Sequence, residues 1–311
     1  MKTICIMSPC YNEEGNIEKL YSRLNDLFAG PLSHYALRLL FIDNHSTDGT
    51  RAIIERLCAA DKRVRAIYNS RNFGHIRSPY HGLMQAEGDC CVAMASDLQD
   101  PPEMIVDMVA KWETGFKIVI AVKTKSRENP LMFAVRKAYY RLVRSVSDIE
   151  LIDNFTGYGL YDRQVVDVLR KIDDPYPYFR GLIAEIGFER ATIPFTQPRR
   201  ERGITKNNFM TLYDMAMLGF TSTSKIPLRI ATMLGFFTAG ASLLVAAGYL
   251  VAKLAFWERF PLGTAPLIIA LFFFGSVQLF FIGLLGEYIL NINARALRRP
   301  LVVEEKRINF E

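Results

Sequence analysis

The 311-residue sequence predicts an α/β domain that is followed by two membrane-spanning helices. Through residues 3–95, short apolar runs alternate with segments of helical periodicity, which is typical of β-α-β units and of a mostly parallel sheet with helices on both faces. Polar residues gather directly after each apolar run. Two later stretches without charge, 232–252 and 261–286, each exceed the roughly 20 apolar residues of a membrane helix.

The first three predicted strands cover residues 3–8, 36–42 and 64–68. Each strand leads into a polar loop and then into a segment with apolar residues at helical spacing, as at Ile17 and Leu20 after the first loop. Parallel strands place their carboxyl ends at one edge of the sheet, where open α/β sheets bind ligands. We therefore expect the polar loops to meet in one site.

The fourth predicted strand is the apolar run Cys90–Ala95, which ends in the polar stretch Ser96–Glu103. An uninterrupted run of this kind is typical of a strand that is buried on both faces. The carboxylate of Asp97 and the amide of Gln99 suit a hard divalent cation, which would neutralise a diphosphate. The alternative is a solvated acidic turn, in which Asp100 caps a helix that begins near Glu103.

Several kinds of site are not supported by the sequence. It contains neither a G-x-G-x-x-G nor a G-x-x-x-x-G-K-[ST] motif, which argues against a dinucleotide site and a P-loop ATPase. The five cysteines lack metal-binding spacing and fit the reduced, mostly buried thiols of a cytosolic domain. The net charge of +6 suits an anionic membrane surface or anionic substrates, and we expect no nucleic-acid partner.

The apolar stretches predict two transmembrane helices over 230–256 and 262–290. The link between them is short, so both outer ends lie on one side of the membrane. Those ends carry five cations: Lys225, Arg229, Arg295, Arg298 and Arg299. The positive-inside rule then predicts a multi-pass protein of the inner (plasma) membrane with its N-terminal domain in the cytoplasm. An amphipathic juxtamembrane region over 206–229 and a cytoplasmic tail over 291–311 complete the chain, and buried core helices are the alternative to the hairpin.

Four loop motifs in a fixed order resemble those of a known enzyme family. They are Pro-Cys-Tyr-Asn-Glu-Glu at 9–14, Asp-Asn-His-Ser-Thr-Asp at 43–48, Ser-Arg-Asn-Phe-Gly-His at 70–75 and Asp-Leu-Gln-Asp-Pro-Pro-Glu at 97–103. Together they resemble the inverting family 2 glycosyltransferases of GT-A fold, which implies a Rossmann-like domain over residues 1–205.

Two further motifs narrow the resemblance. Arg-Arg-Glu-Arg-Gly-Ile-Thr-Lys at 199–206, followed by Pro-Leu-Arg at 227–229 and the apolar stretches, is similar to the polyisoprenyl-phosphate glycosyltransferases. That group contains dolichol-phosphate mannose synthases and bactoprenol glucosyltransferases. The resemblance covers essentially the whole chain.

The resemblance implies a role for each matched residue. The nucleotide of a UDP-sugar would be held by Pro9, Tyr11, Glu13, Asp43, Arg71 and Asp97. Mg²⁺ or Mn²⁺ would be held by Asp97 and Gln99. The acceptor phosphate would be held by Arg127, Arg200, Arg202 and Lys206. The residues expected to carry catalysis are Asp97, Gln99, Arg200 and Lys206. The cation held by Asp97 and Gln99 would stabilise the departing UDP, and Arg200 and Lys206 would neutralise charge on the acceptor phosphate and the donor diphosphate.

Two positions depart from the family pattern. Ala95 stands where the metal motif commonly has its first Asp, so one carboxylate, the Gln99 amide and the diphosphate would have to hold the cation. Gly157 stands where an acid is sometimes assigned as catalytic base. A polyprenyl phosphate is already ionised near neutral pH and can attack without losing a proton, so we assign no base.

The expected function is inverting transfer of one sugar, with a glucose-type hexose favoured, from a UDP-sugar to undecaprenyl phosphate on the cytoplasmic face. The family resemblance also suggests a small homo-oligomer, with a tetramer favoured. Two alternatives stay open. A processive polysaccharide synthase would require a pore and a Q-x-x-R-W motif that this sequence lacks, and an inactive nucleotide-binding membrane scaffold is favoured by Ala95.

Overall fold

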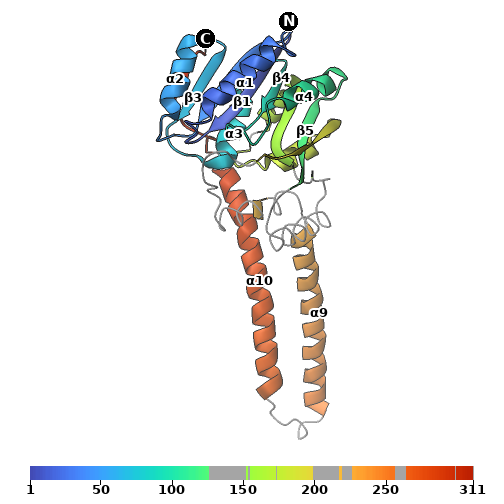
Figure 1. The fold of residues 1–311 in the computed structure, drawn as a ribbon. Coiled ribbons are helices and arrows are strands. Elements are labelled where there is room, and N and C mark those ends of the chain that lie inside the picture. The colour runs from blue at the N-terminus through green and yellow to red at the C-terminus, as the bar shows by residue number, and fades with distance from the viewer. Residues whose placement is uncertain are drawn as a thin grey trace.

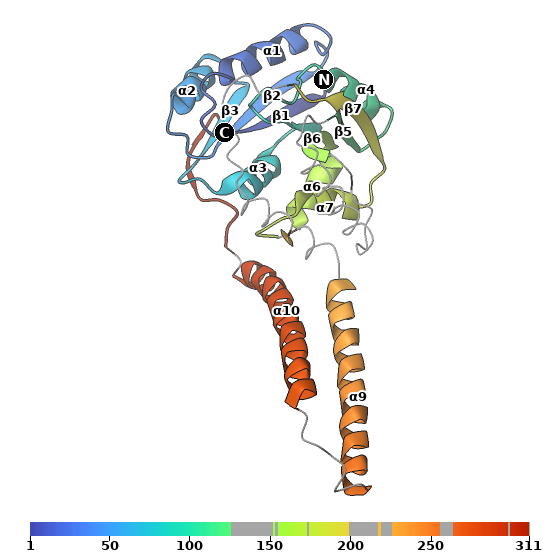
Figure 2. The same ribbon diagram turned by 60° about the horizontal axis from the view of Figure 1, so that its bottom comes forward.

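The computed structural model describes residues 1–125, 152, 155–172, 174–198, 217–218, 226–255, 264–297 and 299–310. An α/β domain is joined to two long helices that extend from the same side of it (Figures 1 and 2). The strands are β1 Thr3–Cys10, β2 Ala36–Asp43, β3 Val64–Asn69, β4 Cys90–Ala93, β5 Ile118–Lys125, β6 Phe155–Asp162, β7 Arg190–Thr196 and β8 Glu304–Ile308. The helices are α1 Ile17–Ala29, α2 Thr50–Ala60, α3 Gly74–Gln85, α4 Met104–Glu113, α6 Arg163–Lys171, α7 Phe179–Glu185, α9 Ile226–Ala255 and α10 Thr264–Ala296.

The strands form one sheet in the order β7-β5-β6-β4-β1-β2-β3-β8. Strands β4, β1, β2 and β3 are parallel neighbours, and β5 pairs in parallel with β7. Strand β6 is antiparallel to both β4 and β5, and β8 is antiparallel to β3. The predicted Rossmann-like α/β architecture is confirmed, and the sheet is mixed.

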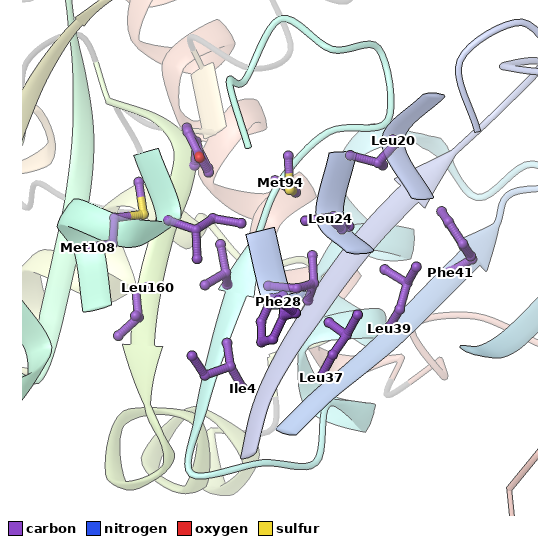
Figure 3. Packing of buried hydrophobic residues seen from close by; sticks show 14 of the residues in the cluster. Ile4, Leu20, Leu24, Phe28, Leu37, Leu39, Phe41, Met94, Met108 and Leu160 are labelled. Atoms are coloured by element: carbon purple, nitrogen blue, oxygen red, sulfur yellow. The ribbon is translucent and has the colours of Figure 1, made fainter. Parts of the chain in front are cut away.

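Helices cover both faces of the sheet, as predicted (Figure 2). Helices α1, α2 and α4 pack on one face, where Leu20, Leu24 and Phe28 of α1 lie over strands β1 and β2 (Figure 3). Helices α3, α6 and α7 pack on the other face, through residues such as Leu83 and Leu169. Burial of both faces explains why the central strands are continuous apolar runs.

The C-terminal segment supplies the edge strand of the sheet. Strand β8 pairs with β3 so that Glu304 lies opposite Asn69 and Ile308 lies opposite Ala66. The strand lies in the segment 291–311, which is expected from the sequence to be a cytoplasmic tail. Because β8 is antiparallel to β3, it begins at the carboxyl end of β3. The chain leaving α10 therefore reaches the sheet where the parallel strands end.

Helices α9 and α10 contain 30 and 33 residues and carry many exposed apolar side chains. Within the described residues, one segment, Phe273–Ala296 of α10, is long and apolar enough to cross a bilayer, with a mean hydropathy of 1.6. The shorter apolar segment Leu228–Thr238 lies in α9. The two-helix membrane hairpin therefore stays a prediction. The link at 256–263 and most of the juxtamembrane region over 206–229 lie outside the described residues.

Candidate functional site

The carboxyl ends of β4, β1, β2 and β3 lie side by side at one edge of the sheet. Each of the four loops turns through a residue with positive φ: Leu98 (59°), Asn12 (58°), His45 (66°) and Gly74 (83°). For residues other than glycine this conformation costs roughly 1–2 kcal/mol, and it persists where surrounding contacts impose it, often at functional sites. Hydrogen bonds between neighbouring loops supply those contacts.

The loops after β4 and β1 are joined by two buried serines. The Ser96 hydroxyl donates to the backbone oxygen of Pro9 at 3.0 Å and lies 2.7 Å from the Ser8 hydroxyl. These bonds fix the Pro9–Tyr11 backbone beside the loop that carries Asp97. Two parts of the predicted site, for the nucleotide and for the cation, are thereby held next to each other.

The loops after β1 and β2 are joined by side chains of both. The backbone nitrogen of Asn12 donates to the Ser46 hydroxyl at 2.9 Å, and the Asn12 side-chain oxygen accepts from the backbone nitrogen of Thr47 at 2.8 Å. The backbone nitrogen of Glu13 donates to Thr50 Oγ1 at 2.8 Å, and Glu13 Oε2 accepts from the Asn16 amide at 2.6 Å. Glu13 is therefore a buried, oriented carboxylate.

Asp43 ends β2 and its side chain is fully buried. Its carboxylate accepts from the backbone nitrogen of Ser46 at 3.1 Å, and Arg51 Nε lies 3.5 Å from Asp43 Oδ2. Burial raises the pKa of Asp43, and the opposing effects of the Ser46 hydrogen bonds, Arg51 and His45 limit the rise. A buried carboxylate with this support suits recognition of a neutral polar group such as a ribose or a base.

Asn44 joins the loops after β2 and β3. Its amide nitrogen donates to Asn72 Oδ1 at 2.9 Å and to the backbone oxygen of Gly74 at 3.2 Å. Its side-chain oxygen accepts from Asn69 Nδ2 at 3.1 Å and from the backbone nitrogen of Phe73 at 2.9 Å. All four hydrogen-bonding positions of the amide are used, so this residue fixes how the two loops sit against each other.

The Asp97 loop carries the carboxylate of Asp97 and the side-chain amide of Gln99, whose oxygens are ligands of the kind that a hard cation accepts. Asp97 Oδ1 accepts from the backbone nitrogen of Gln99 at 3.1 Å, and Gln99 Nε2 lies 3.5 Å from the backbone oxygen of Pro198. Among the described residues, no group of three or more His, Cys, Asp or Glu side chains forms a ready-made metal cage. One carboxylate and one amide oxygen fit Mg²⁺ or Mn²⁺, which bind substrate phosphates and retain waters.

Asp100 does not cap the next helix. Its Oδ2 instead accepts from the backbone nitrogen of Ala95 at 3.0 Å, and α4 begins at Met104 with Glu103 before it. Burial raises the pKa of Asp100 to about 7, and Asp97 adds to the rise. The buried Asp100 carboxylate thus holds the loop backbone at Ala95, which overturns the interpretation of this stretch as a solvated turn.

A cluster of cations lies where the chain leaves α10. The Arg71 and Arg77 guanidinium carbons lie 4.1 and 5.5 Å from the centre of the Phe73 ring, and Arg77 donates to the backbone oxygen of Pro300. Burial holds the pKa of Arg77 below its ordinary value, and Arg71 and Arg299 lower it further. This local positive charge favours an anionic group at this corner of the edge.

Six of the predicted site residues lie along one row of neighbouring strand ends and loops: Pro9, Tyr11, Glu13, Asp43, Asp97 and Gln99. Arg71 lies at the end of this row, three strands from Asp97, a separation of roughly 14 Å at strand spacings near 4.8 Å. The predicted acceptor residues, Arg127, Arg200, Arg202 and Lys206, lie outside the described residues. Gly157, with φ 104°, lies in β6.

Sequence reasoning did not single out Asn12, Asn44, Arg51 or Ser96, which hold this row together. Three of them lie inside the polar loops that the sequence predicts. That location is the one feature of the sequence that could have pointed to them. Their partners belong to other strands and loops, so their roles depend on the strand order.

The fold and this edge define an α/β protein of the kind that binds a ligand beyond the carboxyl ends of its parallel strands. Residues 5–170 match glycosyl transferase family 2. The chain belongs to this family and is a glycosyltransferase.

Similar proteins cover nearly the whole chain. An uncharacterized glycosyltransferase, YkcC, of Bacillus subtilis (strain 168) is 33% identical over 98% of this chain and 94% of its own length. A prophage-derived bactoprenol glucosyl transferase of Shigella flexneri is 31% identical over 97% of both chains. Among solved structures, glucosyl-3-phosphoglycerate synthase from Mycobacterium tuberculosis, in complex with Mn²⁺, UDP and phosphoglyceric acid, is 20% identical over 71% of this chain and 76% of that one. Its TM-score is 0.45.

Proposed function

We propose that this glycosyltransferase moves a single sugar from a UDP-sugar, with a glucose-type hexose favoured, to a polyprenyl phosphate such as undecaprenyl phosphate. The observation that carries the proposal is the attachment of α10 to the loop edge. Strand β8 begins opposite Asn69, the backbone nitrogen of Ser70 donates to the oxygen of Val303 at 2.9 Å, and Arg77 binds the Pro300 oxygen. An acceptor embedded beside α10 therefore reaches the same edge as the donor.

The membrane part of the proposal follows from the same attachment. Segment Phe273–Ala296 would cross the inner (plasma) membrane and, with α9, form the predicted hairpin with both outer ends on the cytoplasmic face. The cations Arg71, Arg77 and Arg299 would then lie at the membrane surface, where they favour anionic lipid groups. The name of the Shigella relative, a bactoprenol glucosyl transferase, supports a lipid-linked acceptor.

The donor would lie along the row of loops. Asp43 and Glu13 would accept hydrogen bonds from the nucleoside, and the Tyr11 ring would stack on the base. Asp97 and Gln99 would hold Mg²⁺ or Mn²⁺, and when bound the cation supplies positive charge to the diphosphate of the leaving UDP. Ser96 keeps the two halves of this site together through its bond to Pro9.

The transfer itself requires positioning more than proton transfer. An oxygen of the ionised acceptor phosphate would form a bond to the anomeric carbon while the bond from that carbon to UDP breaks, so the anomeric configuration inverts. We propose that the acceptor phosphate is gathered by Arg127, Arg200, Arg202 and Lys206. Arginine forks suit phosphate oxygens, and neutralising both anions lowers their repulsion as they approach.

The deciding experiment incubates the full chain, reconstituted in lipid, with radiolabelled UDP-glucose and undecaprenyl phosphate. We expect label in a monoglycosylated lipid that organic solvent extracts. Label in a polymer would identify a processive synthase instead, and retained UDP binding without transfer would identify an inactive scaffold. Thermal stabilisation by UDP-glucose, UDP-galactose, UDP-N-acetylglucosamine or GDP-mannose ranks the donors, since a ligand that binds the folded state raises its stability.

The assembly belongs to the proposal as well. The family resemblance suggests a small homo-oligomer, and we expect a tetramer in detergent. Light scattering with subtraction of the detergent mass measures the number of chains. A monomeric, fully active enzyme would exclude any need for assembly.

A further inference from the structure

Arg51, in the first turn of α2, joins the C-terminal strand to the nucleotide end of the site. Its Nε lies 3.5 Å from Asp43 Oδ2, and its Nη2 lies 2.6 Å from Glu305 Oε2. Its guanidinium carbon lies 4.8 Å from the centre of the buried Tyr68 ring, which supports it from one face. The three charges form a chain from the surface, where Glu305 is 49% exposed, to the fully buried Asp43.

Strand β8 stays docked through contacts that do not involve Glu305. Asn309 Nδ2 donates to the backbone oxygens of Cys58 and Val64 at 2.8 and 2.7 Å. Lys306 pairs with Glu55 of α2 at 2.8 Å. The backbone ladder with β3 adds to these. Loss of the Glu305 carboxylate therefore removes its hold on Arg51 while the strand remains in place.

We propose that Glu305 is a positioning residue for the donor nucleotide, because it holds Arg51 against the carboxylate of Asp43. The inference rests on the proposed function, in which Asp43 binds the nucleoside of UDP. Glu305 lies nine residues after the end of α10 at Ala296, so the segment that leaves the proposed membrane helix completes the donor site from outside the family-matched region at 5–170.

The physical reason is that the Asp43 carboxylate is paired with the Arg51 cation. The groups that face its carboxylate from β1, β3, α2 and its own loop are Cys10, Tyr68, Arg51, His45 and Ser46. Arg51 is 30% exposed, so without Glu305 its side chain gains rotamers that point to solvent. Asp43 then loses its nearest fixed cation, the pKa of its carboxyl rises further, and the neutral form binds a nucleoside hydroxyl or N–H less strongly.

The test measures UDP affinity by calorimetry on the full chain in detergent with Mg²⁺. Glu305→Ala is expected to raise the Kd for UDP and the donor KM about three- to tenfold, with kcat within about twofold. The acidic limb of UDP affinity should shift to higher pH. Glu305→Gln keeps an oxygen that accepts from Arg51 and should recover part of the affinity.

The matched control is Lys306→Ala, which breaks a neighbouring ion pair of similar exposure on the same strand and should leave the Kd unchanged. In an Arg51→Ala background, Glu305→Ala should have no further effect, because the two residues act as one unit. Equal Kd values for wild type and Glu305→Ala, or an undiminished effect in the Arg51→Ala background, would overturn the inference alone. Wild-type protein that binds no UDP would overturn the proposed donor, and the inference with it.

Discussion

Asn44→Asp is the substitution that tests most directly how the loops are held. It replaces the amide nitrogen by an oxygen of nearly the same size, so steric effects are small. The new oxygen faces two acceptors, Asn72 Oδ1 at 2.9 Å and the Gly74 backbone oxygen at 3.2 Å. The other oxygen keeps its bonds from Asn69 and Phe73.

The magnitude follows from these four bonds. Two hydrogen bonds are lost, at about 1 kcal/mol each, and an unsatisfied buried charged oxygen adds roughly 1–3 kcal/mol. We therefore expect a loss of about 3–5 kcal/mol in the free energy of unfolding. For a domain of roughly 200 residues this lowers Tm by about 10 °C. Because the loops after β2 and β3 separate, the affinity for UDP should fall as well.

Thermal melting of the full chain in detergent measures the first effect, and UDP titration measures the second. The control is Asn25→Asp on α1, since the Asn25 side-chain oxygen accepts from Arg63 Nη2 at 2.9 Å and a carboxylate preserves that bond. A Tm for Asn44→Asp within about 2 °C of wild type would refute the reasoning. An equal loss in Asn25→Asp would show that any added charge destabilises the domain.

Three further outcomes are expected. Asp97→Ala should abolish the dependence of UDP affinity on Mg²⁺, measured by titration with and without EDTA, and an unchanged response would exclude Asp97 as a ligand. Gly159→Ala should lower the free energy of unfolding by about 1–3 kcal/mol in a melting experiment, because its Cβ would lie 2.7 Å from the backbone oxygen of Val119. An unchanged Tm would mean that β5 and β6 can shift apart without cost. The Arg63 hydrogen bond holds the pKa of Asp61 below its ordinary value, so that stabilisation is present above pH of about 4 and is lost as pH falls through the lower folded-state pKa. Asp61→Asn should therefore be less stable than wild type at pH 7, by about 1 kcal/mol after solvent screening, and the difference should close as pH falls through that lower pKa; a difference that stays constant with pH would contradict the ionic origin.

The parallel core could be predicted because its information is local. The run Cys90–Ala95 is apolar throughout, and a strand buried on both faces requires that pattern wherever it lies in the sheet. The loop positions of Asp43 and Asp97 follow from the same rule, since each acid comes directly after an apolar run. The α/β fold could therefore be predicted from residues that are adjacent in sequence.

Strand β8 could not be predicted in this way. The sequence of Glu304–Ile308 is Glu-Glu-Lys-Arg-Ile, and charged residues of this kind suit an exposed edge strand but give no apolar signal. Its partner, β3, lies far away in the sequence.

Asp100 illustrates a second limit. Both a helix cap and a bond to Ala95 satisfy its carboxylate, and the choice depends on how the loop turns at Leu98.

The pairing of β8 with β3 also sets the order in which the protein can be completed during synthesis. About 235 residues separate Asn69 from Glu304, and these include both long helices. At translation rates of roughly 5–20 residues per second, the outer edge of β3 stays open for about 10 to 50 s after that strand leaves the ribosome. Throughout that interval the nascent chain exposes a strand edge to which other chains can add, so prompt pairing of β8 with β3 protects it from aggregation.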